Sequence, residues 1–176
     1  VHQDAWSKYY LGFVKPQEIT PADGKQTITL RPANAFPDIY KIDVPDTGGK
    51  EYFMLENRQQ QGYDAGLEYN SDLTPKALHG LVVWHVDESV LARNFYRPNE
   101  APNWDWNMRG ILKFTDPGTG ENHYGISVVQ ADGRYDMERY INDGDAGDVF
   151  PGKLGKTVLS PSIKSNPNTI SYYKLS

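Results

Sequence analysis

The sequence predicts a mainly β protein, an antiparallel β-sandwich or jelly-roll-like sheet with a short N-terminal helix and long loops. Three observations predict this class. Short runs rich in β-branched and aromatic residues recur along the chain, and glycine, proline, asparagine and aspartate separate them. Convincing helical spacing in the first half is confined to the first dozen residues. No long helical pattern lies between the runs, which favours antiparallel over parallel pairing.

The helix is predicted over residues 3–12. Its apolar residues recur at the spacing of one helical face, and Gly12 follows at a position that suits the end of a helix. After Pro16 the pattern changes to strands. The predicted strands are 27–31, 39–44, 52–57, 80–86, 124–130 and 169–175.

The connections between these runs also carry information. Residues 47–50 read Thr-Gly-Gly-Lys, which predicts a hairpin turn into the third run. Residues 93–122 are polar and rich in proline, asparagine and tryptophan, so we expect a surface excursion there. No internal repeat or linker divides the chain, and we treat residues 1–176 as a single β-rich domain.

Composition limits the possible function classes. The chain has 176 residues, is 38% hydrophobic and 12% aromatic, and can therefore build a real core. Its net charge of −5 gives no general attraction to nucleic acid or to an anionic membrane. No apolar run approaches the roughly 18 residues of a membrane span. Cysteine is absent, which excludes disulfides and thiolate metal sites. No signal peptide or initiator methionine is visible, so we expect a mature or excised piece of a protein.

The acidic stretch 142–152, N-D-G-D-A-G-D-V-F-P-G, is the most informative part of the chain. Carboxylates this close repel one another unless a cation lies between them. Calcium fits best, because it accepts oxygen ligands in irregular loops. The alternative is an acidic, solvated turn, the commoner fate of Asp-Gly sequences. The predicted ligands are Asp143, Asp145 and Asp148, with Asn142 beside them and Asp132 from the turn after the 124–130 strand.

Two predicted strands are apolar on both faces and then end in polar residues. This pattern predicts central strands that bring Glu56, Arg58, His85 and Asp87 to one end of the sheet. One interpretation is an ordinary Glu–Arg pair plus a histidine satisfied by a neighbouring aspartate. The other is a site in which the carboxylates bind a metal or contact a substrate.

Several catalytic motifs are absent from the sequence. None of the four histidines begins H-E-x-x-H, so the chain presents no helix with two zinc ligands and a general base. There is no G-x-S-x-G elbow, and without cysteine there is no thiol nucleophile. Trp104 and Trp106 alternate in the polar excursion. They keep open the alternative of a β-sandwich module that binds carbohydrate or protein.

Four segments together resemble one family, the immune-inhibitor-A-like secreted zinc metalloproteases of bacteria. The segments are DAWSKYYLGFVKPQEI (4–19), EYFMLENRQQQGYDAGL (51–67), HGLVVWHVDESV (79–90) and HYGISVVQADGRYDM…NDGDAGDVFPG (123–152). Their order and spacing are similar to the part of the catalytic region that follows the active-site helix. The similarity covers most of the chain apart from residues 93–122.

The resemblance implies that this chain holds only part of the family's catalytic region. In that family an H-E-x-x-H-x-x-G-x-x-D type helix binds zinc, and it would lie upstream of Val1, so no catalytic residue is carried over. The acidic loop matches a G-D-x-G-D segment, which is consistent with a structural cation. Three further elements of the family also have matches here: an E-N-R run, an aspartate that follows it, and an H-x-D run. The matching residues, whose roles are not assigned, are Glu56, Arg58, Asp64, His85 and Asp87.

We therefore expect the C-terminal portion of the catalytic region of a secreted zinc metalloendopeptidase. Its expected partners are the N-terminal remainder of that region and a protein or peptide substrate, with no nucleic acid and no membrane span. This chain would support the zinc helix, complete one wall of the substrate cleft and hold calcium. A binding module and a purely structural domain remain the alternatives.

Overall fold

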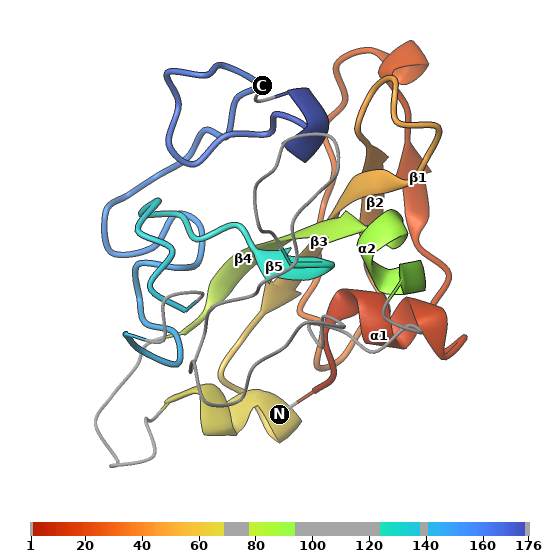
Figure 1. The fold of residues 1–176 in the computed structure, drawn as a ribbon. Helices are drawn as coiled ribbons and strands as arrows, with labels where there is room; N and C mark the ends of the chain where they lie inside the picture. Colours follow the sequence, from red (N-terminus) through yellow and green to blue (C-terminus); the bar gives the residue numbers. More distant parts are fainter. Residues whose placement is uncertain (1, 69–77, 94–123, 138–140, 175–176) are drawn as a thin grey trace.

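A five-stranded sheet forms the centre of the molecule, in the order β1-β2-β3-β4-β5 (Figure 1). The computed structural model describes residues 2–68, 78–93, 124–137 and 141–174. The strands are β1 (Gln17–Ile19), β2 (Tyr40–Asp43), β3 (Glu51–Arg58), β4 (Gly80–Asp87) and β5 (Ile126–Val128). The helices are α1 (Ala5–Tyr10) and α2 (Glu88–Arg93), with 3-10 turns η1 (Pro21–Asp23), η2 (Gly62–Glu68) and η4 (Tyr172–Lys174).

The sheet is mixed, which corrects the expectation of purely antiparallel pairing. Strands β2 to β5 pair antiparallel, but β1 pairs parallel with β2. A parallel neighbour needs a connection of about a dozen residues or more to return the chain to the same end of the sheet. Residues 20–39 provide it and contain η1. The hairpin turn predicted at 47–50 is confirmed by the Lys50 N–H, which donates to the Thr47 carbonyl at 3.3 Å.

Two predicted strands are wrong. Residues 27–31 lie in the connection between β1 and β2, where the Arg31 N–H donates to the Asp38 carboxylate at 3.1 Å instead of to a ladder. In the described part of 169–175, residues 172–174 form η4. There the backbone N–H of Tyr172 donates to the Glu51 carboxylate at 2.8 Å, so a side chain replaces the strand partner.

The predicted N-terminal helix is confirmed as α1. Asp4 caps its first turn, because its Oδ1 accepts from the Ser7 N–H at 2.8 Å and its Oδ2 from the Ser7 hydroxyl at 2.6 Å. Helix α2 was not predicted from sequence. Asp87, the last residue of β4, caps it by accepting from the Ser89 N–H at 2.8 Å.

One face of the sheet is covered by α1 and α2 (Figure 1). We call it the helix-covered face. Trp6 of α1 and Leu91 of α2 are buried there against Tyr52, Met54 and neighbouring residues of the central strands. Glu88 joins the three elements, since it accepts from the Tyr52 hydroxyl at 2.5 Å and the Trp6 indole at 3.2 Å.

The opposite face of the sheet is packed against irregular segments. Phe53 and Val83 are buried there with Val129, Ala131 and Phe150. Phe150 also exchanges backbone hydrogen bonds of 2.8 and 2.9 Å with Leu81 of β4. Among the described residues this layer contains no second sheet, so the predicted sandwich is not confirmed. Within the same residues, no helix is long and apolar enough to pass through a membrane.

Candidate functional site

A buried group of charges lies at the Arg58 end of β3. Glu56 is fully buried and accepts from the Lys8 ammonium at 3.0 Å and the Trp84 indole at 2.9 Å. The Arg58 Nε lies 2.9 Å from Glu56 Oε1, close enough for an ion pair but not aligned for a hydrogen bond. Helix α1, β3 and β4 therefore meet at one carboxylate.

The Arg58 guanidinium extends this group to the start of the chain. It donates to both oxygens of Asp64, at 3.0 and 3.1 Å, and to the backbone carbonyls of His2 and Gln3. Asp64, on η2, is fully buried and also accepts from the His2 N–H at 2.7 Å. We call Lys8, Glu56, Arg58 and Asp64 the buried charge network.

Two positive and two negative side chains balance within this network. Burying an ion without a partner costs several kcal/mol. Removing one member of the network would therefore leave an oppositely charged member buried without full compensation. The network brings together three residues singled out from the sequence, namely Glu56, Arg58 and Asp64. Lys8 was not predicted, because its helical position gave no sign of a partner 48 residues away.

His85 and Asp87 do not join this network, so the prediction of one shared cluster is wrong. Strands β3 and β4 are antiparallel, with Arg58 opposite Gly80 and Glu51 opposite Asp87. The polar ends of the two runs therefore lie at opposite ends of the sheet. The antiparallel register moves both residues away from the buried charge network.

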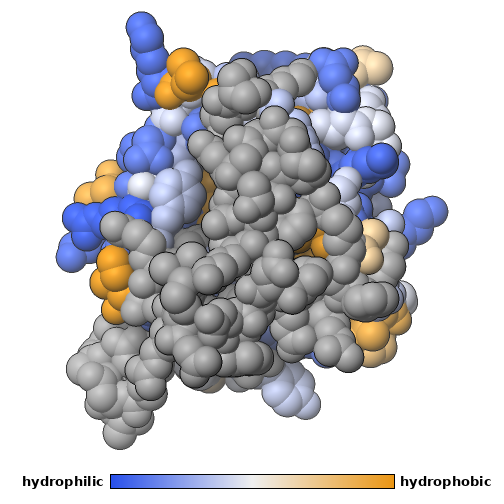
Figure 2. Space-filling view, viewed as in Figure 1, coloured by the Kyte–Doolittle hydropathy of each residue, from blue (hydrophilic) through white to orange (hydrophobic). Residues whose placement is uncertain are grey.

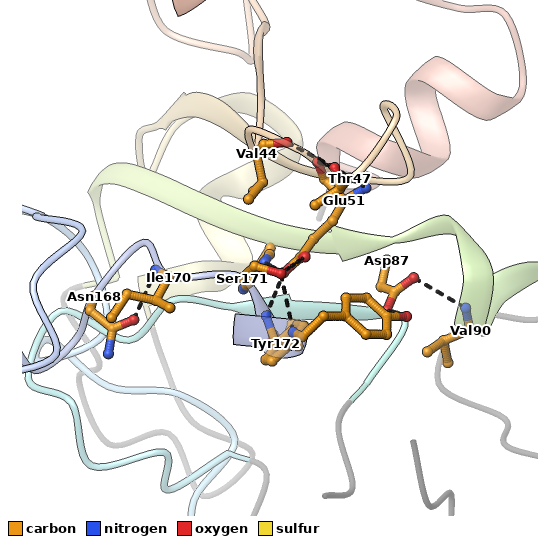
Figure 3. Close-up of polar contacts among 12 residues, drawn as sticks. Val44, Thr47, Glu51, Asp87, Val90, Asn168, Ile170, Ser171 and Tyr172 are labelled. Carbon is orange, nitrogen blue, oxygen red and sulfur yellow. Dashed lines mark hydrogen bonds and ion pairs between the residues drawn. The ribbon is translucent and has the colours of Figure 1, made fainter. Parts of the chain in front are cut away.

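A second buried site surrounds Glu51, with Ser171 and Tyr172 beside it (Figure 3). His85 belongs to this site. The fully buried Glu51 carboxylate lies 2.7 Å from His85 Nε2 and accepts from the Ser171 hydroxyl at 2.5 Å. The His85 ring stacks between Phe53 and Tyr172, with centroids 4.2 and 4.1 Å apart. Glu51 was not predicted from the sequence, because two of its partners, Ser171 and Tyr172, lie 120 and 121 residues downstream.

Asp87 is also held by the C-terminal segment. Its Oδ2 accepts from the Tyr173 hydroxyl at 2.5 Å, while its Oδ1 caps α2. Glu51 and Asp87 are directly opposite on neighbouring strands, where like charges repel. The hydroxyl and N–H donors of residues 171–173 compensate for this repulsion, which indicates a structural role for both carboxylates.

The acidic loop is folded by its own side chains. Asp145 accepts from the Gly147 N–H at 2.6 Å and from the Asn142 amide at 3.1 Å. Asp148 Oδ2 accepts from the Asp145 N–H at 2.6 Å. A Cβ at Gly147 would lie 2.7 Å from the Asp132 carboxylate, so only glycine permits this approach. Asp132 thus lies beside the loop as predicted, whereas Asp143 is exposed.

Among these carboxylates, Asp148 has the least favourable electrostatic environment. It is buried, and its pKa is raised from the ordinary value of 3.8 to about 6. Burial is the main cause, and the nearby carboxylates of Asp145, Asp132 and Asp136 add repulsion. A cation between these groups would relieve both effects.

The described residues contain no ready-made metal site of three or more histidine, aspartate or glutamate side chains. The carboxylate oxygens of Asp145 accept from loop donors instead of converging on one point. Calcium binding by this loop therefore stays a prediction that requires the oxygens to turn inward.

A cavity of about 220 Å³ lies between the buried charge network and the acidic loop. Its charged lining residues are Asp4 and Arg58, together with Asp143 and Asp148 of the acidic loop. Its remaining lining is mainly apolar and comes from both sheet strands and loops: Leu67, Leu78, Val82, Trp84, Val128, Met137 and Val149. Apolar cavities with a few polar groups are typical binding sites. This cavity is the strongest candidate for one here.

Comparisons of the chain with protein-family models, with curated proteins and with solved structures found no match.

Replacing Arg58 with alanine is expected to destabilise the fold by about 3–5 kcal/mol. Among the described residues, Asp64 would be left buried without a cationic partner, and Glu56 would keep only Lys8 and the Trp84 indole. Arg31→Ala is the matched control. Arg31 also pairs with a carboxylate, that of Asp38 at 2.8 Å, but its side chain is 53% exposed. Asp38 is only 8% exposed, but water reaches the pair from the Arg31 side, so the control should cost less than Arg58→Ala, roughly 1–2 kcal/mol. Urea unfolding of both variants measures the difference, and equal losses would contradict the assignment.

Asp148→Asn is expected to stabilise the protein at pH 7 by about 1–2 kcal/mol in the presence of a chelator. Because the pKa of folded Asp148 is raised to about 6, this group stabilises the fold below pH 4 and loses that contribution as pH rises through 6. The variant should therefore gain nothing at pH 4. Thermal unfolding at both pH values tests this, and a variant that is less stable at pH 7 would refute it.

Proposed function

We propose that the chain is the C-terminal portion of the catalytic region of a secreted bacterial zinc metalloendopeptidase, of the immune-inhibitor-A-like family. The observation that carries this proposal is that the four segments bearing the resemblance form one connected unit. The Lys8–Glu56 pair joins the first to the second, and the Trp84–Glu56 hydrogen bond joins the second to the third. Backbone bonds between Leu81 and Phe150 join the third to the fourth.

In such an enzyme, residues upstream of Val1 would hold zinc, which would supply an activated water and a Lewis acid for the scissile carbonyl. A glutamate on the same upstream helix is the general base. The residues of this chain have a supporting role. The buried charge network fixes the backbone of residues 2 and 3 against the sheet, and with it the point where the upstream polypeptide would join. The 220 Å³ cavity beside it offers an apolar wall for the substrate cleft.

The remaining features belong to the same proposal. Secretion follows from the family resemblance. The sandwich-like or jelly-roll-like arrangement also stays proposed, because part of the chain lies outside the described residues. The alternative binding module relies on Trp104 and Trp106, which lie in that part as well. Among the described residues, the Trp84 indole donates a hydrogen bond to Glu56 inside the fold. No observation on these residues favours that alternative.

The proposal predicts that peptide hydrolysis needs residues upstream of this chain. The purified chain should not cleave casein, even with added zinc, because it lacks H-E-x-x-H. The full-length gene product should cleave it, lose activity to a chelator and regain activity with zinc. Zinc-restored turnover by the chain alone, or a full-length product that neither binds zinc nor cleaves peptides, would contradict the proposal.

We also propose a structural calcium ion at the acidic loop. Asp143, Asp145 and Asp148 would supply carboxylate oxygens, with Asn142 from the loop and Asp132 from the neighbouring turn. The supporting observation is the crowding of Asp132, Asp145 and Asp148, whose mutual repulsion a cation would cancel.

Calcium is therefore expected to raise the thermal midpoint. At free calcium about a hundredfold above the dissociation constant, the added stability is roughly 2.7 kcal/mol. Asp145→Ala should remove this response, whereas Asp23→Ala, at an exposed turn elsewhere, should keep it. An identical midpoint with calcium and with excess chelator would show that the loop is only an acidic turn.

A further inference from the structure

Exposed apolar side chains gather around the end of α1. The described residues contain eleven large apolar side chains that are exposed, and six of them lie on or near this helix. The most exposed of these six are Tyr63 at 78% and Phe13 at 69%. Figure 2 shows hydrophobic surface at the lower right, where Figure 1 places α1. A concentration of this kind indicates a contact surface rather than scattered exposure.

Three of the six, Phe13, Phe36 and Tyr63, line a groove of about 480 Å³ between α1, the 33–37 turn and η2. We call it the aromatic groove and define it by His2, Phe13, Val14, Phe36, Pro37 and Tyr63. Its walls are already ordered. The His2 ring packs edge-on against Tyr63 at 5.3 Å, and the Arg31 guanidinium lies 4.1 Å from the centre of the Phe36 ring. A preformed wall lowers the entropic cost of binding.

The backbone of His2 is fixed at the rim of this groove. Its N–H donates to Asp64 and its carbonyl accepts from Arg58, two members of the buried charge network. Any polypeptide that precedes residue 2 therefore joins the described fold at a residue that lines the groove together with Tyr63 and Phe13. A segment joined this closely has an effective concentration in the millimolar range, so weak apolar contacts suffice to hold it.

We propose that the aromatic groove is the docking surface for the polypeptide that immediately precedes Val1, and that apolar side chains of that segment fill it. This inference rests on the proposed function, which places the zinc-binding part of the catalytic region upstream. It adds a location for the contact between the two parts. The groove suits an apolar partner because its exposed lining is mainly apolar, with Gln3 as its exposed polar member, and because the Lys8 ammonium is paired with Glu56.

Cysteine labelling tests the proposal, because the chain contains no cysteine of its own. Phe13→Cys and Tyr63→Cys place a thiol in the groove. Ile163→Cys is the control, since Ile163 is 75% exposed and does not line the groove. Each variant is prepared both as this chain and as the full-length gene product, and thiol modification is followed by mass spectrometry of the labelled peptides.

In the isolated chain all three thiols should react rapidly, and the thermal midpoint should stay close to wild type because each side chain is exposed. In the full-length product, positions 13 and 63 should react at least about tenfold more slowly, while position 163 keeps its rate. Equal rates in both proteins would overturn the proposal. Protection that appears in the isolated chain as its concentration rises would assign the groove to a second copy and overturn it too.

Zinc-dependent casein cleavage by the same full-length protein separates the two claims. Cleavage without protection at positions 13 and 63 would leave the proposed function standing and refute this docking surface. Protection without cleavage would support the docking surface and count against the protease.

Discussion

The fold depends above all on the fully buried carboxylate of Glu56, which lies where α1 meets the two central strands. Lys8 and Trp84 donate to it, and Arg58 lies beside it. Because a buried charge is tolerated only with compensation, these elements must assemble together or not at all. Arg58 then binds Asp64 and the backbone of residues 2 and 3. The position of the N-terminal segment thus follows from the same requirement that aligns the helix on the sheet.

The other end of the sheet solves a similar problem in a different way. Glu51 and Asp87 face each other across β3 and β4, and the cost of their repulsion is offset by hydroxyl and N–H donors from residues 171–173 (Figure 3). The acidic loop is the least compensated group. Its carboxylates are served by loop N–H groups, and Asp148 keeps a raised pKa. This contrast is why we place the proposed calcium at the loop and assign structural roles to the carboxylates of the sheet.

Sequence patterns predicted those parts of the fold that depend on local chemistry. The helical spacing of Trp6 and its apolar neighbours predicted α1, and the long apolar runs predicted β3 and β4. Strand register and long-range side-chain partners could not be predicted from the sequence. Antiparallel pairing put His85 at the far end from Arg58, and nothing local to Lys8 or Glu51 announced partners 48 and 120 residues away. Residues 27–31 have strand-like composition, but side-chain bonds to Asp38 hold the backbone in a connection instead. The grouping of Asp132 with the acidic loop was predictable, because close carboxylates and glycines are visible in the sequence itself.

A double-mutant cycle between Lys8 and Glu56 tests the central claim most directly. Urea unfolding of Lys8→Met, Glu56→Gln and the double variant gives the coupling free energy of the two side chains. We expect a coupling free energy of about 2–3 kcal/mol, because each single variant leaves the other charge buried and only the double variant removes both. A coupling near zero, with single losses that simply add, would show that the helix and the sheet associate through apolar packing alone.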